Sequence, residues 1–369
     1  MRVGILGGGQ LGWMLARAGD PLGIRCRFLD PSPDAPGSRA GELVVGAYDD
    51  AAALDRFADR LALATYEFEN VPVDSARRLA ARLPVLPPPA ALEVAQDRLA
   101  EKRFFESLDV PVPPWRAVDS LADLARAVDE LGTPAVLKTR RLGYDGKGQA
   151  VIRGSGDVTP AWDRLGGVPL VLESFVRFDR ELSILAVRGR DGVTACYPLV
   201  ENLHADGILR RSLAPAPGVS ATAQAQADAH ARRMLDALGY VGVLAIELFQ
   251  VGDRMLANEM APRVHNSGHW TIEGAETSQF ENHLRAIAGL PLGSTAPRGM
   301  SAMLNLVGAV PDVSAVLALP GAHLHLYGKA PRPGRKLGHV TLRADGPREL
   351  DRLRAQVEPL IVPNPGGAA

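Results

Sequence analysis

Short apolar runs separated by turns and one amphipathic segment open the chain. The first apolar run is followed by a glycine-rich turn, a segment of helical spacing at 13–18 and a second apolar run, which together predict a βαβ unit. The proline-rich segment 83–89 ends this unit, because proline continues neither a helix nor a strand. The predicted strands of the unit are 2–6, 26–30, 43–46 and 62–70.

Beyond the prolines, longer helices and strands follow one another. Helical spacing predicts helices over 90–108, 121–131, 221–238 and 278–289. Apolar, β-prone runs predict strands over 135–138, 150–153, 170–176, 182–187, 303–307, 323–327 and 338–342. The polar stretch 197–211 is predicted to be a loop. The pattern as a whole indicates an α/β (α+β) fold.

One pair of apolar runs, 244–251 and 255–260, predicts a hairpin with a glutamate on each strand. A two-residue turn at Gly252-Asp253 would pair Glu247 with Asn258 and place the glutamates on opposite faces. A three-residue loop or one bulge would instead set Glu247 across from Glu259, with Cβ atoms roughly 5 Å apart. We predict the second geometry.

Two carboxylates at this short distance repel each other unless a proton or a cation lies between them. Hard oxygen ligands, here Glu247 and Glu259 with the Asn258 carbonyl beside them, favour Mg²⁺ or Mn²⁺. Magnesium held by few carboxylates usually shares its other positions with phosphates, so the hairpin indicates a nucleotide site. The alternative is that both glutamates are solvated strand residues.

Polar side chains crowd the segment that follows the hairpin, where Pro262 prevents the strand from continuing. A loop so rich in donors, next to a metal site, is typical of a place where an anionic substrate binds. The candidate residues are Arg263, His265, Asn266, Ser267 and His269.

Gly7, Gly9 and Gly12 match a dinucleotide-binding fingerprint, and Asp30 ends the second predicted strand. By itself this pattern guarantees only that a phosphate or sugar can approach a helix N-terminus. A nicotinamide-dependent oxidoreductase therefore stays open as an alternative. Glu67 and Glu69 end a neighbouring strand and face the same crevice, or else they are capping or solvated charges.

Lysine is rare: five of the 41 basic residues are lysines, and four of these fall at or near two glycine- or proline-rich stretches. The first, 140–149, is predicted to fold over phosphates between two strands. The second, 329–336, suits a phosphate monoester. The alternatives are chance and ordinary exposed turns. The chain has no P-loop motif.

A length of 369 residues exceeds what one core usually supports, so two or three units are expected. The apolar content of 46%, charged content of 22% and net charge of -1 indicate a soluble globular protein and argue against nucleic-acid or membrane binding. Two cysteines, no signal peptide and no apolar run of about 18 residues favour the cytoplasm.

Seven stretches together resemble the ATP-grasp superfamily and, within it, the N5-carboxyaminoimidazole ribonucleotide synthetases of purine biosynthesis. They are GGGQLGWML, YEFENV, QDRLAEK, GYDGKGQ, YPLVENLHADGIL, NEMAPRVHNSGHW and RPGRKLGHV, and they span nearly the whole chain. One position departs from the pattern, because Leu142 stands where similar sequences usually have a second glycine.

The resemblance implies that ATP and bicarbonate carboxylate 5-aminoimidazole ribonucleotide through carboxyphosphate, releasing ADP and phosphate. It implies a Rossmann-like domain over 1–95, an ATP-grasp domain over 96–295 with a lid over about 105–175, and a small β-rich domain over 296–369. A homodimer is also implied. One alternative is another ATP-grasp ligase, such as the formate-using glycinamide ribonucleotide enzyme, and a further one is a nucleotide-binding module without chemistry.

The resemblance also assigns roles to residues. Mg²⁺ or Mn²⁺ would be held by Glu247 and Glu259. Bicarbonate would be positioned by Arg263, His265 and Asn266. ATP would be bound by Arg98, Lys138, Gly143, Tyr144, Asp145, Gly146, Lys147, Gly148, Gln149, Glu173, Ser174, Phe175, Val176, Glu181, His204, Asn258 and Glu259. The ribonucleotide would be bound by Gln10, Leu11, Glu67, Tyr144, Asp145, Lys329, Arg335 and Lys336.

Overall fold

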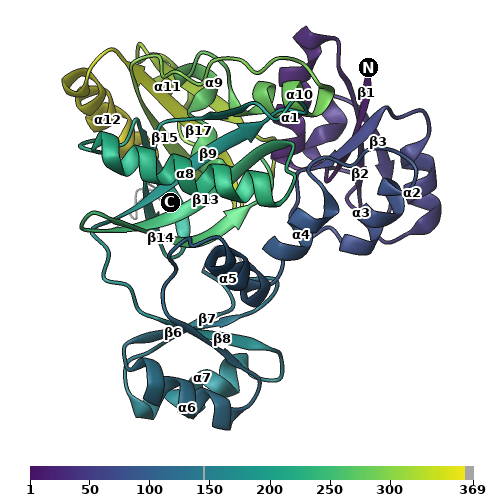
Figure 1. Ribbon diagram of the computed structural model, residues 1–369. Helices are drawn as coiled ribbons and strands as arrows, with labels where there is room; N and C mark the ends of the chain where they lie inside the picture. Colours follow the sequence, from purple (N-terminus) through teal and green to yellow (C-terminus); the bar gives the residue numbers. More distant parts are fainter. Residues whose placement is uncertain (144–145, 362–369) are drawn as a thin grey trace.

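A computed structural model describes residues 1–143 and 146–361 of the chain. The first body contains a parallel sheet in the order β3-β2-β1-β4 (Figure 1). The βαβ unit predicted at the start is confirmed, because β1 pairs in parallel with both β2 and β4. Its elements are β1 (Arg2–Leu6), α1 (Gln10–Gly19), β2 (Arg25–Asp30), β3 (Glu42–Val45), α2 (Ala51–Ala58), β4 (Leu63–Tyr66) and α3 (Val73–Ala80), with short 3₁₀ turns at Asp20–Leu22 and Pro36–Arg39.

The single helix predicted over 90–108 is wrong, since two helices, α4 (Pro89–Ala95) and α5 (Arg98–Ser107), occupy this stretch. Asp97 stands between them in extended conformation, and its carboxylate accepts from the backbone N–H groups of Leu99 and Ala100. An aspartate in this role starts a new helix, so α5 begins at Arg98 instead of continuing α4.

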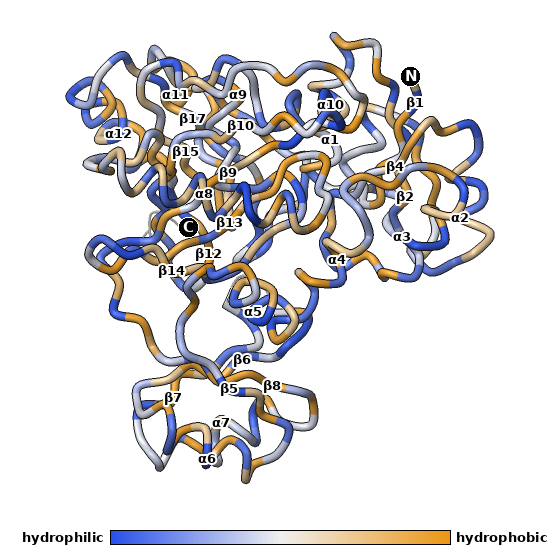
Figure 2. The backbone as a smooth tube through the Cα atoms, viewed as in Figure 1, coloured by the Kyte–Doolittle hydropathy of each residue, from blue (hydrophilic) through white to orange (hydrophobic). Residues whose placement is uncertain are grey.

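A small antiparallel sheet in the order β5-β8-β6-β7 forms a second body, which we call the lid. Its helices α6 and α7 lie on the side away from the rest of the molecule (Figure 1). Figure 2 shows apolar residues along its strands, in agreement with its separate buried core. Its elements are β5 (Trp115–Val118), α6 (Leu121–Leu131), β6 (Ala135–Thr139), β7 (Gln149–Ile152), the 3₁₀ turn Ser155–Asp157, α7 (Val158–Leu165) and β8 (Leu170–Ser174).

The third body is built on a nine-stranded sheet in the order β14-β13-β9-β11-β12-β15-β17-β16, with β10 also paired to β9. The C-terminal strands therefore continue the central sheet through the pairing of β12 with β15. Its elements are β9 (Arg180–Arg188), β10 (Thr194–Cys196), β11 (Val200–Ala205), β12 (Ile208–Ala214), α8 (Ala221–Ala237), β13 (Gly242–Val251), β14 (Arg254–Ala261), the 3₁₀ turn Asn266–Gly268, α9 (Thr271–Gly274), α10 (Gln279–Ala288), β15 (Met300–Val307), α11 (Val313–Leu317), β16 (Ala322–Leu326), β17 (Lys336–Ala344) and α12 (Pro347–Ile361).

The loop predicted over 197–211 is also wrong, because most of this stretch is the hairpin of β11 and β12. A buried polar residue, Asn202, lies within this stretch. Asn202 and Ser212 are buried, and they satisfy each other through a hydrogen bond of 2.7 Å from Ser212 Oγ to Asn202 Oδ1. A buried polar pair of this kind interrupts the apolar alternation on which strand prediction depends.

His283 joins the first body to the third. Its Nδ1 accepts the backbone N–H of Val243 at 3.1 Å, and its Nε2 lies 2.9 Å from the Thr65 hydroxyl. Nδ1 is the acceptor, so Nε2 carries the ring proton and donates it to Thr65. Burial of the ring lowers the pKa of His283 to about 3.

Acid should therefore destabilise this junction. The folded pKa lies below the ordinary value of about 6.5, so the contribution of His283 is complete above pH 6.5 and is lost as the pH falls toward 3. Between pH 7 and pH 5 this residue alone should remove about 2 kcal/mol from the free energy of unfolding. Denaturant titrations of the wild type and of His283→Gln measure the effect, and equal pH slopes for the two proteins would contradict it.

Candidate active site

The hairpin of β13 and β14 places the two glutamates opposite each other, as predicted. The strands pair from Val251 with Arg254 to Leu248 with Ala257, and then the register shifts so that Glu247 faces Glu259. The turn itself has two residues, and the extra residue in the bulge is Asn258. The bulge, and not the turn, therefore places the two glutamates on the same face of the hairpin.

The two carboxylates have different electrostatic surroundings. Burial, together with the charge of Glu259, raises the pKa of Glu247 to about 7. Burial also opposes ionisation of Glu259, but Arg98 and Lys138 outweigh it and lower the pKa of Glu259. Arg98 Nη1 lies 3.1 Å from Glu259 Oε2. Glu259 is thus kept ionised by its cationic neighbours, whereas Glu247 holds a proton more readily despite the nearby charges of His204 and Lys336.

Asn258 supports the same interpretation of the hairpin. Its side-chain oxygen is buried without a hydrogen-bond partner among the described residues, while Lys102 Nζ donates to its backbone carbonyl at 2.9 Å. The described part of the chain contains no group of three or more His, Cys, Asp or Glu residues that could hold a metal ion. A divalent ion beside Glu247, Glu259 and the Asn258 oxygen would need further oxygens from a ligand, which fits a phosphate-bridged Mg²⁺.

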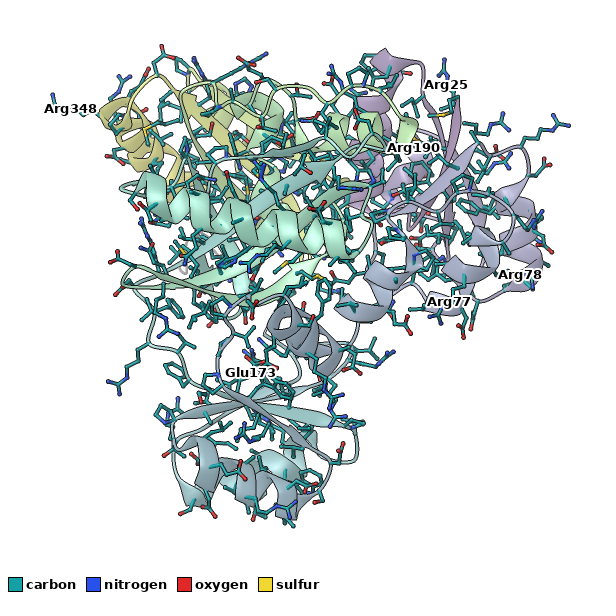
Figure 3. The ribbon with its side chains drawn as sticks, viewed as in Figure 1. Arg25, Arg77, Arg78, Glu173, Arg190 and Arg348 are labelled. Atoms are coloured by element: carbon teal, nitrogen blue, oxygen red, sulfur yellow. The ribbon has the colours of Figure 1, made fainter. Side chains whose placement is uncertain are left out.

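Glu173 at the end of β8 lies on the edge of the lid that faces α5 (Figure 3). Its Oε2 accepts from Lys138 Nζ at 3.0 Å, and Lys102 Nζ lies 3.3 Å from the same oxygen. Burial opposes its charge, but these lysines and Arg98 lower the pKa of Glu173 to about 2. Burial lowers the pKa of Lys138. The cluster contains more cations than anions, as expected where phosphates bind.

A cavity opens directly beside Glu173, between the lid and the large sheet. The predicted residues Ser174, Phe175 and Val176 line it. Phe178 and Phe249 also line it and stack with ring centroids 4.8 Å apart. A cavity lined by apolar side chains and stacked rings suits a purine base.

Four site residues were missed in the sequence. Phe249 stands two residues after Glu247, a spacing that puts both side chains on one side of β13. Phe178, which precedes the neighbouring strand β9, stacks on Phe249. Glu101 and Lys102 stand three and four residues after Arg98, on one face of α5. Glu101 accepts the Met260 backbone N–H at 2.7 Å, which ties α5 to β14. Both spacings were present in the sequence.

Glu181 and His204 meet on neighbouring strands and form an ion pair. Burial lowers the pKa of His204, but the hydrogen bond to Glu181 and the charge of Glu247 outweigh it, so that the pKa is raised. The structure thus brings His204 into the same site as the carboxylate pair.

The segment from Arg263 to His269, which we call the anion turn, lies beside the carboxylates. His265 Nε2 is 3.7 Å from Glu247 Oε1, and burial lowers the pKa of His265 well below its usual value. Asn266 and Asn305 of β15 exchange two amide hydrogen bonds, of 2.7 and 3.1 Å. Arg263 Nη2 pairs with Glu69 Oε2 of the first body at 2.7 Å. All three bodies of the chain therefore contribute to the surroundings of the site.

The loop over 140–149, here the lid loop, is anchored to α5 and to the strands of the lid. Arg98 donates its backbone N–H to Arg140 O at 2.9 Å, and Gln149 pairs with Lys138 in the sheet. Gly146 approaches Gly207, since a Cβ on Gly146 would lie 3.1 Å from the Gly207 Cα. The lid loop thus reaches the turn between β11 and β12. Its remaining predicted and described ligands are Gly143, Lys147 and Gly148.

Leu142 adopts a φ of +62°, a region that glycine enters more easily, and its side chain is exposed. The lid loop therefore retains a glycine-like backbone at the position that departs from the family pattern. The predicted ligands Tyr144 and Asp145 lie outside the described residues.

The backbone amides of the glycine-rich turn before α1 donate hydrogen bonds to carboxylates of the same chain. Gly8 N donates to Asp30 at 2.8 Å, and Gly9 N donates to Glu67 at 2.7 Å. These are the groups that a dinucleotide pyrophosphate would need, so this geometry argues against a nicotinamide cofactor here. Leu11 packs into the core and presents no side chain to a ligand.

The predicted phosphate-binding turn over 329–336, which we call the basic turn, lies against the glycine-rich turn of the first body. Lys329 Nζ donates to the Gln10 side chain. Burial lowers the pKa of Lys329, although the charge of Glu67 opposes this shift. Lys336 lies close enough to influence the pKa of both Glu247 and His265. Arg335 is half-buried and donates to Ala330 O at 3.2 Å.

Three family models match successive parts of the chain. A ribonucleotide synthetase preATP-grasp domain matches residues 1–96, an ATP-grasp domain matches 103–280, and a phosphoribosylaminoimidazole carboxylase C-terminal domain matches 301–353. The chain is 54% identical over 361 residues to the N5-carboxyaminoimidazole ribonucleotide synthase of Pseudomonas aeruginosa, covering 98% of this chain and 99% of the relative. The corresponding protein of Brucella melitensis is 49% identical over 346 residues, covering 92% and 95%.

Solved structures agree with these matches. The N5-carboxyaminoimidazole ribonucleotide synthetase of Thermus thermophilus superposes with a TM-score of 0.95 at 62% identity, covering 98% of this chain and 99% of the other. The Aspergillus clavatus enzyme in complex with ADP and 5-aminoimidazole ribonucleotide superposes with a TM-score of 0.90 at 33% identity, covering 98% and 97%. Helices long and apolar enough to cross a membrane are absent from the described part of the chain.

Proposed function

The chain belongs to the N5-carboxyaminoimidazole ribonucleotide synthases of the ATP-grasp superfamily, and from this premise we propose how its residues perform the reaction. The enzyme is an ATP-dependent ligase of purine biosynthesis that carboxylates 5-aminoimidazole ribonucleotide with bicarbonate. The γ-phosphate of ATP is transferred to bicarbonate to give carboxyphosphate and ADP. The amine of the ribonucleotide then takes the carboxyl group, and phosphate leaves.

The proposal for the site rests mainly on one observation, the pairing of Glu247 with Glu259 between a cationic cluster and the anion turn. We assign the two glutamates and Asn258 to a divalent cation, Mg²⁺ or Mn²⁺, which when bound supplies positive charge to the phosphates. The buried, unpartnered oxygen of Asn258 supports this fit.

ATP would extend from the cavity beside Glu173 to the hairpin. The adenine would lie among Ser174, Phe175 and Val176, with the two stacked phenylalanines beside it. The ribose would meet Glu181 and His204. Arg98, Lys138 and the lid loop would contact the phosphates, where their charges offset the charge that moves onto ADP.

Bicarbonate would lie against Arg263, His265 and Asn266 of the anion turn. Arg263 is held by Glu69 and Asn266 by Asn305, so both side chains are preorganised before the anion arrives. The burial of this turn supports the exclusion of water, which carboxyphosphate requires because it hydrolyses readily.

The ribonucleotide would occupy the crevice between the first body and the basic turn. Its phosphate would meet Lys329, Arg335 and Lys336, and the rest would lie along the loop of Gln10 and Leu11 and beside Glu67. Leu11 would take part only through its backbone. Tyr144 and Asp145 of the lid loop complete this proposed set.

Arg335→Ala should raise the KM for the ribonucleotide by about 10- to 100-fold, because a charge-assisted bond to phosphate is lost. The KM values for ATP and bicarbonate should stay unchanged. The hydrogen bond from Arg335 to Ala330 O is exposed to solvent, so the thermal stability of the variant should match that of the wild type. Steady-state kinetics with each substrate varied in turn measures this. An unaltered ribonucleotide KM would remove the basic turn from the site.

The choice of acid distinguishes this function from its nearest rival, a formate-using ribonucleotide ligase. ADP release should require bicarbonate together with 5-aminoimidazole ribonucleotide, and formate with glycinamide ribonucleotide should not replace them. Product identification by mass spectrometry completes the test. The alternative of a binding module without chemistry predicts no ADP release with any pair.

Three further properties belong to the same proposal. The relatives support a cytoplasmic enzyme of nucleotide metabolism, and family resemblance supports a homodimer, which sedimentation velocity would test. We also retain the division into domains at 1–95, 96–295 and 296–369, with a lid over about 105–175. The ranges of the three family models support this division.

A further inference from the structure

A buried series of hydrogen bonds runs from the large sheet to the anion turn. Ser212 donates to Asn202 at 2.7 Å, and Asn202 Nδ2 donates to Ser183 Oγ at 2.9 Å. Ser183 donates to Ser267 at 2.8 Å, and Ser267 Oγ lies 2.9 Å from His265 Nδ1. The three serines and Asn202 are buried, so each polar group depends on the next for its hydrogen bond.

The direction of this series is fixed at the imidazole. The backbone N–H of Ser267 points at His265 Nδ1 over 3.3 Å, and a backbone N–H can only donate. Nδ1 is therefore an acceptor. The Ser267 hydroxyl already accepts from Ser183, so its own proton is directed to the same nitrogen. An imidazole whose Nδ1 accepts carries its proton on Nε2.

The Nε2 nitrogen faces the carboxylate pair. It lies 3.7 Å from Glu247 Oε1, beyond hydrogen-bonding distance, so this contact leaves its N–H available to a ligand beside the carboxylates. We propose that Asn202, Ser183 and Ser267 are positioning residues that hold His265 in the Nε2–H tautomer, so that the ring donates a hydrogen bond to bicarbonate. The contact with bicarbonate rests on the proposed function, whereas the tautomer is a property of the protein alone.

Asn202→Asp tests the series with almost no change in shape. A carboxylate accepts but does not donate, so Ser183 would turn its hydroxyl toward residue 202 and Ser267 would donate to Ser183. Nδ1 of His265 would then face an oxygen lone pair, which favours a proton on Nδ1. The backbone N–H of Ser267 still opposes a proton on Nδ1, so the variant should raise the share of the Nδ1–H tautomer without reversing the tautomer completely.

Nitrogen NMR of the full-length enzyme labelled in its histidines observes this directly. The signals of His265 are assigned by their loss in His265→Gln. The wild type should show a protonated Nε2, and Asn202→Asp a mixture with a measurable share of protonated Nδ1. Ser301→Ala is the matched control, because this buried serine of β15 has a hydroxyl without a partner among the described residues. A protonated Nδ1 in the wild type would overturn the inference, and so would a tautomer unchanged by Asn202→Asp.

Kinetics tests the contact with bicarbonate separately. Ser267→Ala should raise the KM for bicarbonate by about fivefold to tenfold, the effect of weakening one hydrogen bond, and leave the KM for ATP unchanged. Ser267→Thr, which restores the hydroxyl, should recover most of the loss. An altered tautomer with an unchanged bicarbonate KM would overturn the role of the ring toward bicarbonate. An enzyme that does not use bicarbonate would refute the proposed function and leave the NMR result standing.

Discussion

Glu259→Gln should lower the rate of ADP formation by about 100- to 1,000-fold, because it removes one of the two carboxylate charges assigned to the divalent cation. The substitution preserves volume. It also leaves Arg98, now 3.1 Å from the carboxylate, without its anionic partner. ADP release in the presence of bicarbonate, ribonucleotide and Mg²⁺ measures the effect. Affinity for Mg²⁺ in the presence of a nonhydrolysable ATP analogue should fall in parallel.

Glu281→Gln provides the control for this prediction. Glu281 lies on α10 and pairs with Arg285, outside the nucleotide site, so its loss should leave turnover near that of the wild type. Thermal unfolding of both variants shows whether folding is retained. Turnover of Glu259→Gln within a few fold of the wild type would contradict the assignment of this residue to the metal.

Arg263→Met should lower kcat/KM for bicarbonate by at least about 100-fold, since a small anion with few contacts depends strongly on one guanidinium. ATP binding, measured by calorimetry, should be preserved. Arg263→Lys should recover part of the loss, because lysine keeps the charge but not the two-pronged geometry.

The ion pair between Arg263 and Glu69 complicates this test, and a double-mutant cycle resolves it. If Arg263 only tied the first body to the third, Glu69→Gln would reproduce the whole loss. We expect Glu69→Gln to change kcat/KM by about two- to fivefold, as for a partly exposed ion pair. A loss in Glu69→Gln equal to that in Arg263→Met would refute the direct role toward bicarbonate.

Local patterns in the sequence were sufficient for much of the site. The parity of the hairpin required either a longer turn or a bulge, and the bulge at Asn258 is what brings Glu247 opposite Glu259. The scarcity of lysine drew attention to Lys138 and to the basic turn, which lie near the carboxylates. The hairpin prediction is confirmed because strand alternation acts over a few residues, whereas the binding role of the lysines stays a prediction.

Other features depend on contacts between distant segments. Asn202 made its strand resemble a loop, and only its buried partners, Ser183 and Ser212, explain a polar residue there. Asp97 divides a helix because its carboxylate turns back to cap the next one. The fingerprint glycines suggested a dinucleotide, and the competing carboxylate, Glu67, comes from 58 residues further along the chain.

The continuity of the large sheet constrains which parts of the enzyme move when ATP binds. The anion turn follows β14, and the basic turn precedes β17, so the hydrogen-bonded strands from β14 to β17 hold these segments at a fixed separation. The lid joins this body through the segments before β5 and after β8, as Figure 1 shows. Closure over the nucleotide is therefore expected to be a rotation of the lid toward the large sheet. The sheet itself should stay fixed and keep the anion turn and the basic turn in place.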